Sequence, residues 1–313
     1  MTTLLTGATG FLGRHLVPLL AERGDPLRAL VREGTDDAFL RPFDVAVVRG
    51  DITDEEAVRR AAQGCERVFH LAGLLGYRTS QKASLERINV DGVRVVLDAL
   101  EPGARLVHVS SVAAVGPVDR ATDRADESHP YPPRADRSLY SLTKRRGEEL
   151  VLDAARNGVD AVVANPGFLL GPGDVYRVNT WPVQRYLQGT LRFLVEGGLS
   201  NVDPRDVAQG LVALADRGRA GERTILTSPR GNLSHEAFFR RVGEVTGVRR
   251  RQVVLPAKAA LAAARVVPWP VRPEEVAAAS DWWFFDPSKA QSELGFTTRP
   301  LDESIAATAS QYR

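Results

Sequence analysis

A tyrosine and a lysine four positions apart, Tyr140 and Lys144, are the residues of this chain best suited to acid–base chemistry. In a helix, residues four apart lie on one face, so the phenol and the ammonium would project together. A free tyrosine has a pKa of about 10, and a neighbouring ammonium favours the phenolate and lowers that value. The phenol could then give a proton to a carbonyl oxygen, or take one from an alcohol. Such pairs also occur by chance on helix surfaces, so their context decides.

Ser111 supplies a hydroxyl that could donate to the same oxygen. It ends the apolar run 107–111, a predicted strand, and a doubly wound sheet carries its reactive groups at the carboxyl ends of its strands. Ser110 is expected to have the structural role of a cap. We therefore predict Ser111, Tyr140 and Lys144 as the catalytic residues.

A glycine-rich stretch at residues 6–13, TGATGFLG, lies between a short apolar run and a stretch with helical apolar spacing. Strand, glycine turn and helix place a pyrophosphate on the helix N-terminus, where unpaired N–H groups favour an anion. Gly7 would make the tight turn, Gly10 would let phosphates approach, and Gly13 would let the helix pack on its strand. The spacing is GxxGxxG and not the standard GxGxxG, so a simple turn is the competing interpretation.

Short apolar strands alternate with amphipathic helices through the first half of the chain. Strands are predicted at Leu27–Val31, 45–48, 67–71, 105–110 and 160–164, and helices at 55–63 with Thr53 as cap, 85–100 and 139–157. This alternation predicts an α/β fold with a doubly wound parallel sheet. After residue 165 the pattern becomes irregular. We assign 1–165 and 205–245 to a dinucleotide-binding Rossmann domain, and 166–204 and 246–313 to a smaller substrate lobe.

The end of the second predicted strand decides which nucleotide fits. Arg32 stands there and offers a fork of donors suited to the 2′-phosphate of NADP, whereas an acidic residue would select NAD. Arg14 could approach the same phosphate. Asp51 and Ile52 could border the adenine, although Asp51 could equally be a helix-start residue. The sequence thus predicts NADP(H) in preference to NAD(H).

Composition sets further bounds. The 313 residues are 43% hydrophobic, and a net charge of +2 gives no reason to expect a nucleic-acid partner. The single cysteine, Cys65, forms no internal disulfide and suits a reducing compartment. The apolar stretch 257–269 contains Lys258 and Arg265 and is too short to span a bilayer. We expect a cytoplasmic protein with no integral membrane segment and no metal site.

These motifs occur in the order seen in extended short-chain dehydrogenases/reductases, which the chain resembles over almost its whole length. The nearest branch contains dihydroflavonol reductases and 3β-hydroxysteroid dehydrogenases. The matching positions are 6–13, Arg32, 51–52, 70–73, 89–90, 110–111, Tyr140 with Lys144, 165–167, 201–208 and 285–290.

The resemblance implies catalytic roles for Ser111, Tyr140 and Lys144 and a structural role for Asn89. Dimers formed through helices of the cofactor domain are common in the family. The residues expected to bind the cofactor are Gly7, Thr9, Gly10, Phe11, Leu12, Gly13, Arg32, Asp51, Ile52, Leu71, Ala72, Gly73, Tyr140, Lys144, Pro166 and Gly167.

The favoured function is reduction of a small, fairly apolar ketone or aldehyde, or the reverse oxidation of an alcohol, by NADP(H). The expected substrate residues are Leu74, Tyr77, Ser111, Phe168 and Val175. The first alternative is an NAD-dependent sugar-nucleotide epimerase or dehydratase. Val115 argues against it, since those enzymes commonly carry a tyrosine there, and so does Arg32. The second alternative is a nucleotide sensor without catalysis, which typically lacks the Tyr-xxx-Lys pair.

Overall fold

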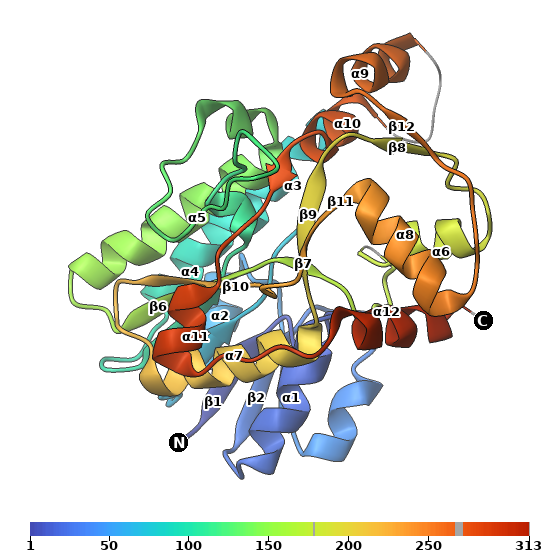
Figure 1. Cartoon of the computed structure of the whole chain (residues 1–313). Coiled ribbons are helices and arrows are strands. Elements are labelled where there is room, and N and C mark those ends of the chain that lie inside the picture. Colours follow the sequence, from blue (N-terminus) through green and yellow to red (C-terminus); the bar gives the residue numbers. More distant parts are fainter. Residues whose placement is uncertain (178, 267–271, 313) are drawn as a thin grey trace.

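The computed structural model describes residues 1–177, 179–266 and 272–312. A seven-stranded parallel sheet in the order β10-β6-β5-β4-β1-β2-β3 forms its centre (Figure 1). Its strands are β1 (Thr3–Thr6), β2 (Leu27–Val31), β3 (Ala46–Arg49), β4 (Arg67–His70), β5 (Arg105–Val109), β6 (Ala161–Pro166) and β10 (Arg223–Leu226). The strand order reverses between β1 and β4, which is where a doubly wound sheet binds its ligand. The predicted fold class is confirmed.

Helices cover both faces of this sheet (Figure 1). The helices α1 (Gly13–Glu22), α7 (Pro204–Arg217) and α11 (Ser288–Leu294) bury their apolar sides on one face. The other face is covered by α2 (Glu55–Ala62), α4 (Gly92–Asp98) and α5 (Leu139–Arg156). Both faces of the strands are therefore apolar, which explains their continuous hydrophobic runs.

Two local predictions were wrong. The cap of α2 is Asp54 and not Thr53, because the Asp54 carboxylate accepts from the Glu56 and Ala57 amides, both at 3.1 Å. The helix predicted at 85–100 is interrupted. It consists of α3 (Lys82–Glu86), a π-helical segment η3 (Arg87–Asp91) and α4. Short 3₁₀ helices lie at η1 (Ala38–Phe43), η2 (Thr79–Gln81), η4 (Val112–Ala114) and η5 (Pro133–Arg137).

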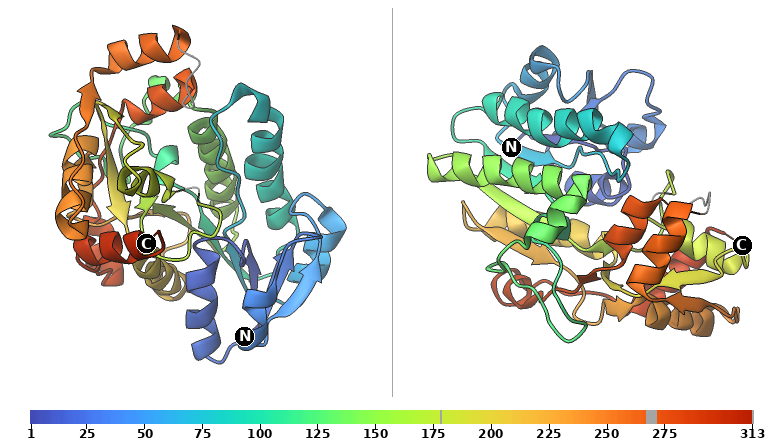
Figure 2. Two further views of the ribbon diagram at one scale, coloured as in Figure 1. Left: turned by 90° about the vertical axis from the view of Figure 1, so that its right-hand side faces the viewer. Right: turned by 90° about the horizontal axis from the view of Figure 1, so that it is seen from above.

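A second lobe is built around β9 (Gly198–Val202), which pairs with β7 (Phe168–Leu169), β11 (Asn232–Ser234) and β13 (Trp282–Trp283). Figure 2 shows this lobe from two further sides. Its other elements are α6 (Trp181–Leu187), β8 (Phe193–Val195), α8 (His235–Thr246), β12 (Val253–Leu255), α9 (Ala257–Val266), α10 (Pro273–Ala279) and α12 (Leu301–Ser310).

The packing divides the chain differently from the predicted boundaries. Helix α8, which was assigned to the dinucleotide-binding domain, packs with α6 and α12, and its Phe239 stacks on Tyr186 at 5.4 Å. Conversely, α11 and Phe296 were assigned to the substrate lobe but join the core beneath the sheet. The apolar faces of these helices determine their partners, and sequence order does not.

Within the described residues, no helix is long and apolar enough to cross a membrane. Residues 267–269 of the apolar stretch 257–269 lie outside the described part of the chain.

Two buried histidines face each other in the middle of the sheet. His70 in β4 pairs in register with His108 in β5, and their ring centroids are 5.2 Å apart. His70 Nδ1 bonds to Thr6 Oγ1 at 2.7 Å, whereas both ring nitrogens of His108 lack a partner among the described residues. Burial, with a smaller effect of the Lys144 charge, lowers the pKa of His70 to about 3 and that of His108 well below its usual value.

These histidines should make the fold acid-sensitive. An unfolded histidine has a pKa of about 6.5, so the unfolded chain binds the extra protons first as the pH falls. Stability is then fully present above pH 6.5 and decreases toward the folded-state pKa. One such histidine should lower the free energy of unfolding by about 2 kcal/mol at pH 5 relative to pH 7.5. Urea unfolding at both pH values measures this, and His108→Gln should reduce the difference. An unchanged difference in that variant would contradict the assignment.

Candidate active site

The serine at the end of β5 is held by the turn that follows it. Ser111 caps η4, and its Oγ accepts from the Ala113 amide at 3.2 Å. We had expected Ser110 to be the cap, but Ser111 is, because its extended backbone directs the hydroxyl back onto the turn. Ser111 Oγ accepts this bond, so its own proton can be donated, in this structure toward Tyr140.

The tyrosine and the lysine lie on the first turns of α5. Ser138 caps this helix by accepting from the Ser141 amide at 3.2 Å, which places Tyr140 in the first turn and Lys144 one turn later. Lys144 Nζ donates to the Val109 carbonyl oxygen at 2.9 Å, and Tyr140 hydrogen-bonds with Ser111. The structure therefore brings Ser111, Tyr140 and Lys144 together at the carboxyl end of β5.

The pKa of Tyr140 does not follow the prediction made from the spacing of Tyr140 and Lys144. Burial raises the pKa of Tyr140, and the hydrogen bond with Ser111 partly offsets this. The expected lowering of that pKa by Lys144 is therefore not what this structure shows; the Lys144 amine is directed at Val109. Burial lowers the pKa of Lys144 to about 8, against an opposing effect of Glu148. Most Lys144 side chains are thus still ammonium at neutral pH.

The glycine turn after β1 forms a cradle that side chains would fill. Gly7 has a φ of 76°, and a Cβ there would lie 2.9 Å from the backbone of both Leu71 and Ala72. A Cβ at Gly13 would lie 2.3 Å from the Gly7 carbonyl oxygen, so α1 requires glycine to pack this closely. A Cβ at Gly10 would lie 3.1 Å from the same Gly7 oxygen and would meet no other described atom within 4 Å, apart from its chain neighbours. The space beside Gly10 is therefore open.

Unpaired amides face this cradle. The N–H groups of Phe11 and Leu12, just before α1, donate to no acceptor in the described part of the chain. Such amides at a helix N-terminus bind phosphate. A Cβ at Gly73 would lie 3.8 Å from Lys144 Nζ, so the segment from Leu71 to Gly73 runs from the turn to Lys144. These residues therefore fit a dinucleotide that runs from the turn to Lys144.

The region predicted to bind the adenosine part of the cofactor, around Arg32 and Asp51, carries more cations than the sequence indicated. Arg32 is exposed at the end of β2. The pKa of Asp51 is lowered. Burial alone would raise it, but hydrogen bonds from Thr53 and the charges of Arg87 and Arg32 outweigh burial. Arg87 Nη1 lies 3.5 Å from Asp51 Oδ1.

Three further residues here have structural roles that the sequence did not reveal. Arg49 donates to the Arg32 carbonyl oxygen at 3.3 Å. Ile52 is buried in the core, and Arg14 donates to the Thr9 carbonyl oxygen at 3.1 Å while lying over Phe39 at 4.8 Å. Neither Arg49 nor Arg87 was predicted, because each reaches this corner from a different element.

The predicted substrate residues lie in different environments. The Tyr77 ring centroid is 6.2 Å from that of Tyr140. The Leu74 amide donates to Asn89 Oδ1 at 2.8 Å, so the expected structural role of Asn89 includes fixing this loop. Phe168 lies half-buried in β7, whereas Val175 is 51% exposed. Tyr77 thus places an aromatic ring beside Tyr140.

Pro166, predicted to bind the cofactor, is buried at the end of β6. A Cβ at the adjacent Gly167 would lie 2.5 Å from the Ser200 carbonyl oxygen. This glycine is therefore required for packing on β9, whatever it contributes to a cofactor.

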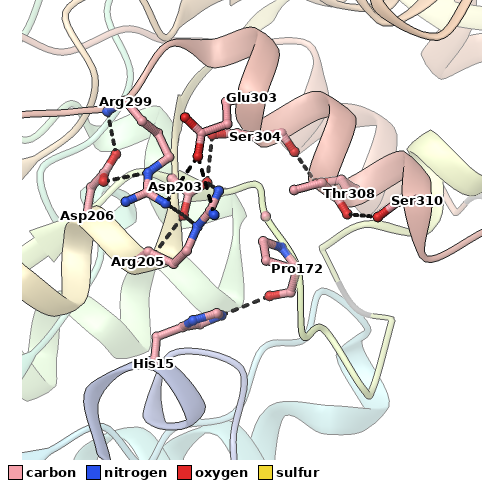
Figure 3. A network of polar contacts seen from close by, with 12 residues as sticks. His15, Pro172, Asp203, Arg205, Asp206, Arg299, Glu303, Ser304, Thr308 and Ser310 are labelled. Atoms are coloured by element: carbon pink, nitrogen blue, oxygen red, sulfur yellow. Dashed lines mark hydrogen bonds and ion pairs between the residues drawn. The ribbon is translucent and has the colours of Figure 1, made fainter. Parts of the chain in front are cut away.

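The segment that carries Val175 is fastened to the start of α1. His15 forms a hydrogen bond with the Pro172 carbonyl oxygen at 2.8 Å (Figure 3). The His15 ring packs edge-on against Phe11, with ring centroids 6.0 Å apart. Beside this contact, Asp203 accepts from Arg205 and from Ser304 of α12 at 2.8 Å and 2.7 Å. The substrate lobe is thereby tied to the glycine turn.

In the described chain, no group of three or more His, Cys, Asp or Glu side chains could hold a metal ion.

A doubly wound sheet, an anion cradle and an adjoining Ser-Tyr-Lys cluster define a nicotinamide-dependent enzyme. The chain belongs to the NAD dependent epimerase/dehydratase family, whose sequence pattern matches residues 3–226. The predicted resemblance is thus confirmed.

Individual relatives agree with this assignment. A Synechocystis protein provisionally named dihydroflavonol 4-reductase is 31% identical, over 96% of this chain and 92% of its own. The ceramide reductase of Caulobacter vibrioides is 32% identical, over 84% of this chain and 76% of its own. The crystal structure of gox2253 superposes with a TM-score of 0.88 at 29% identity, covering 100% of this chain and 98% of that one. The protein is therefore an NAD(P)-dependent enzyme of this superfamily.

Alanine at two of the glycines should separate folding from cofactor binding. Gly13→Ala forces a Cβ against backbone oxygens and should cost about 1–3 kcal/mol of stability. Gly10→Ala should keep a near-normal melting temperature but weaken NADPH binding about tenfold or more, because the methyl group enters the phosphate space. Thermal melts and NADPH fluorescence titrations measure both effects. Normal melting and normal binding in both variants would contradict the cradle.

Proposed function

We propose that the protein is an NADP(H)-dependent carbonyl reductase or alcohol dehydrogenase that acts on a fairly apolar ketone, aldehyde or secondary alcohol. The observation that carries this proposal is the convergence of Ser111, Tyr140 and Lys144 beside the glycine cradle. The bound cofactor supplies the hydride, and the protein supplies orientation and a proton.

Each of the three side chains has a distinct task in the proposed reaction. Ser111 donates its hydroxyl proton in a hydrogen bond to the substrate oxygen. Tyr140 gives its phenolic proton to the same oxygen as a ketone is reduced, and removes it in the reverse direction. Lys144 has three N–H donors, of which one is used by Val109 at 2.9 Å. The other two remain for the hydroxyls of the nicotinamide ribose.

The preference for reduction of an apolar substrate has two supports. Tyr77 places an aromatic ring beside Tyr140. Relatives of this chain are named for the reduction of ceramide and of dihydroflavonol. An apolar wall next to a single polar point would orient the carbonyl group toward Ser111 and Tyr140.

A sugar-nucleotide epimerase or dehydratase that uses NAD is the second candidate, favoured by the family to which the chain belongs. Against it, Val115 is fully buried in an apolar cluster and offers no hydroxyl where such enzymes commonly have a tyrosine. NAD retained through purification, detected by mass spectrometry, would support this candidate.

Removal of the phenolic hydroxyl should abolish most of the activity. Tyr140→Phe should lower kcat at least about a hundredfold on the best substrate from a panel of apolar ketones and aldehydes, with NADPH binding unchanged. NADPH absorbance follows the reaction. Tyr186→Phe is the matched control, because its hydroxyl bonds to Val248 at 2.9 Å, in the other lobe. Nearly intact turnover in Tyr140→Phe would refute the mechanism.

A charge reversal at the end of β2 tests the cofactor preference. Wild-type protein should bind NADPH more tightly than NADH, and Arg32→Glu should weaken NADPH binding about tenfold or more by repelling the 2′-phosphate. Fluorescence titration with both nucleotides gives the ratio. Equal affinity for the two nucleotides in wild-type protein would contradict the NADP preference.

A further inference from the structure

Three polar side chains form a buried chain of contacts behind the site. Arg223 Nε in β10 lies 2.9 Å from Glu148 Oε1 on α5. Asn165 Nδ2 in β6 donates to Glu148 Oε2 at 2.6 Å. Glu148 is 1% exposed and Asn165 is fully buried. A carboxylate this deeply buried must be compensated by its partners, and Arg223 and Asn165 provide that compensation.

This chain of contacts reaches the catalytic serine. The same Asn165 amide donates to the Ser111 carbonyl oxygen at 2.9 Å. That oxygen also accepts from the Ala114 amide at 2.9 Å. The Ser111 peptide is therefore held from two sides, and one of them depends on the orientation that Glu148 imposes on Asn165.

The same carboxylate acts on the catalytic lysine. Glu148 follows Lys144 by four residues, one helical turn along α5. Its negative charge raises the pKa of Lys144 against the larger lowering by burial. Among the described residues, His70 from β4 and His108 from β5 feel the charge of Lys144, and Tyr140 precedes it by one turn of α5. Both histidines are uncharged at neutral pH, because their pKa values lie far below 7.

We propose that Glu148 is a positioning residue that serves two catalytic groups at once: its charge keeps Lys144 an ammonium, and its bond to Asn165 holds the Ser111 peptide in place. Arg223 anchors the carboxylate from the edge of the sheet. The inference rests on the proposed roles of Ser111 and Lys144. An ion pair that only fastened α5 to β10 would affect the stability of the protein and neither catalytic group.

The sequence allows a direct test, since the chain has only four lysines, Lys82, Lys144, Lys258 and Lys289. The full-length protein labelled with ¹³C at the lysine ε-carbon should give few resonances, and Lys144→Met identifies the one of interest. Titration from about pH 6 to about pH 11 then yields the pKa of Lys144. Glu148→Gln should lower it by about one unit, because a nearby opposite charge favours the charged form by shifts of that order or more. It should also lower kcat more than it changes KM.

Two variants complete the design. Asp160→Asn removes a carboxylate that pairs with Arg105 at 2.8 Å. Both residues lie at the amino ends of β5 and β6, away from the carboxyl ends that carry the site. This control should leave the Lys144 titration unchanged even if it destabilises the protein. If Glu148→Gln fails to fold, the double variant Glu148→Gln with Arg223→Gln removes both charges together and should give the same downward shift.

The outcomes are distinguishable. A Lys144 titration identical in wild-type and Glu148-substituted protein overturns the inference. Because the titration needs no turnover, a downward shift in a protein that reduces no carbonyl compound would support the role of Glu148 in holding the ammonium and contradict the proposed reaction. Normal carbonyl reduction by wild-type protein, with no change of the Lys144 pKa in Glu148→Gln, would support the proposed reaction and overturn the role of Glu148.

Discussion

The hydrogen bond from Lys144 Nζ to the Val109 carbonyl oxygen is the contact on which the site depends, because it fastens α5 to the end of β5 at 2.9 Å. Lys144 is only 6% exposed, so its ammonium has lost most of its water and needs this acceptor. Tyr140 lies one turn before it, and Ser111 lies two residues beyond Val109. A single contact between helix and strand thereby sets the relative positions of a phenol, an ammonium and a hydroxyl.

The anion cradle is coupled to that contact through the backbone. The glycine turn after β1 packs against the end of β4, and the residues that follow β4 reach Lys144. The first of these contacts needs glycine, since a Cβ at Gly7 would meet backbone atoms of Leu71 and Ala72 at 2.9 Å. Parallel strands cannot slide past one another without breaking their ladders. The sheet consequently fixes the distance between the glycine turn and Lys144.

The sequence predicted much of this arrangement for clear physical reasons. Apolar runs four to six residues long between amphipathic segments are typical of strands covered on both faces, and each strand from β2 to β6 was found within two residues of its predicted bounds. The errors came from contacts between distant residues. The packing of α8 was not visible in the sequence, because its partners, α6 and α12, lie about 50 residues before and after it. The π-helical turn at Arg87–Asp91 has no periodic signature in the sequence.

The three catalytic candidates were found because type and spacing alone define their chemistry. Glu148 was missed, although its spacing of four from Lys144 was visible, because its partners Asn165 and Arg223 come from separate strands. Likewise, local spacing suggested that Lys144 would lower the pKa of Tyr140, whereas burial, which no local pattern shows, raises it.

A crystal structure of the complex with NADP⁺ tests the central claim most directly. The account predicts phosphates against the amides of Phe11 and Leu12, Lys144 Nζ at about 3 Å from the nicotinamide ribose hydroxyls, and the Tyr140 hydroxyl beside the reactive ring. A nicotinamide ring bound away from Tyr140 and Ser111, or a glycine turn that holds no phosphate, would contradict it.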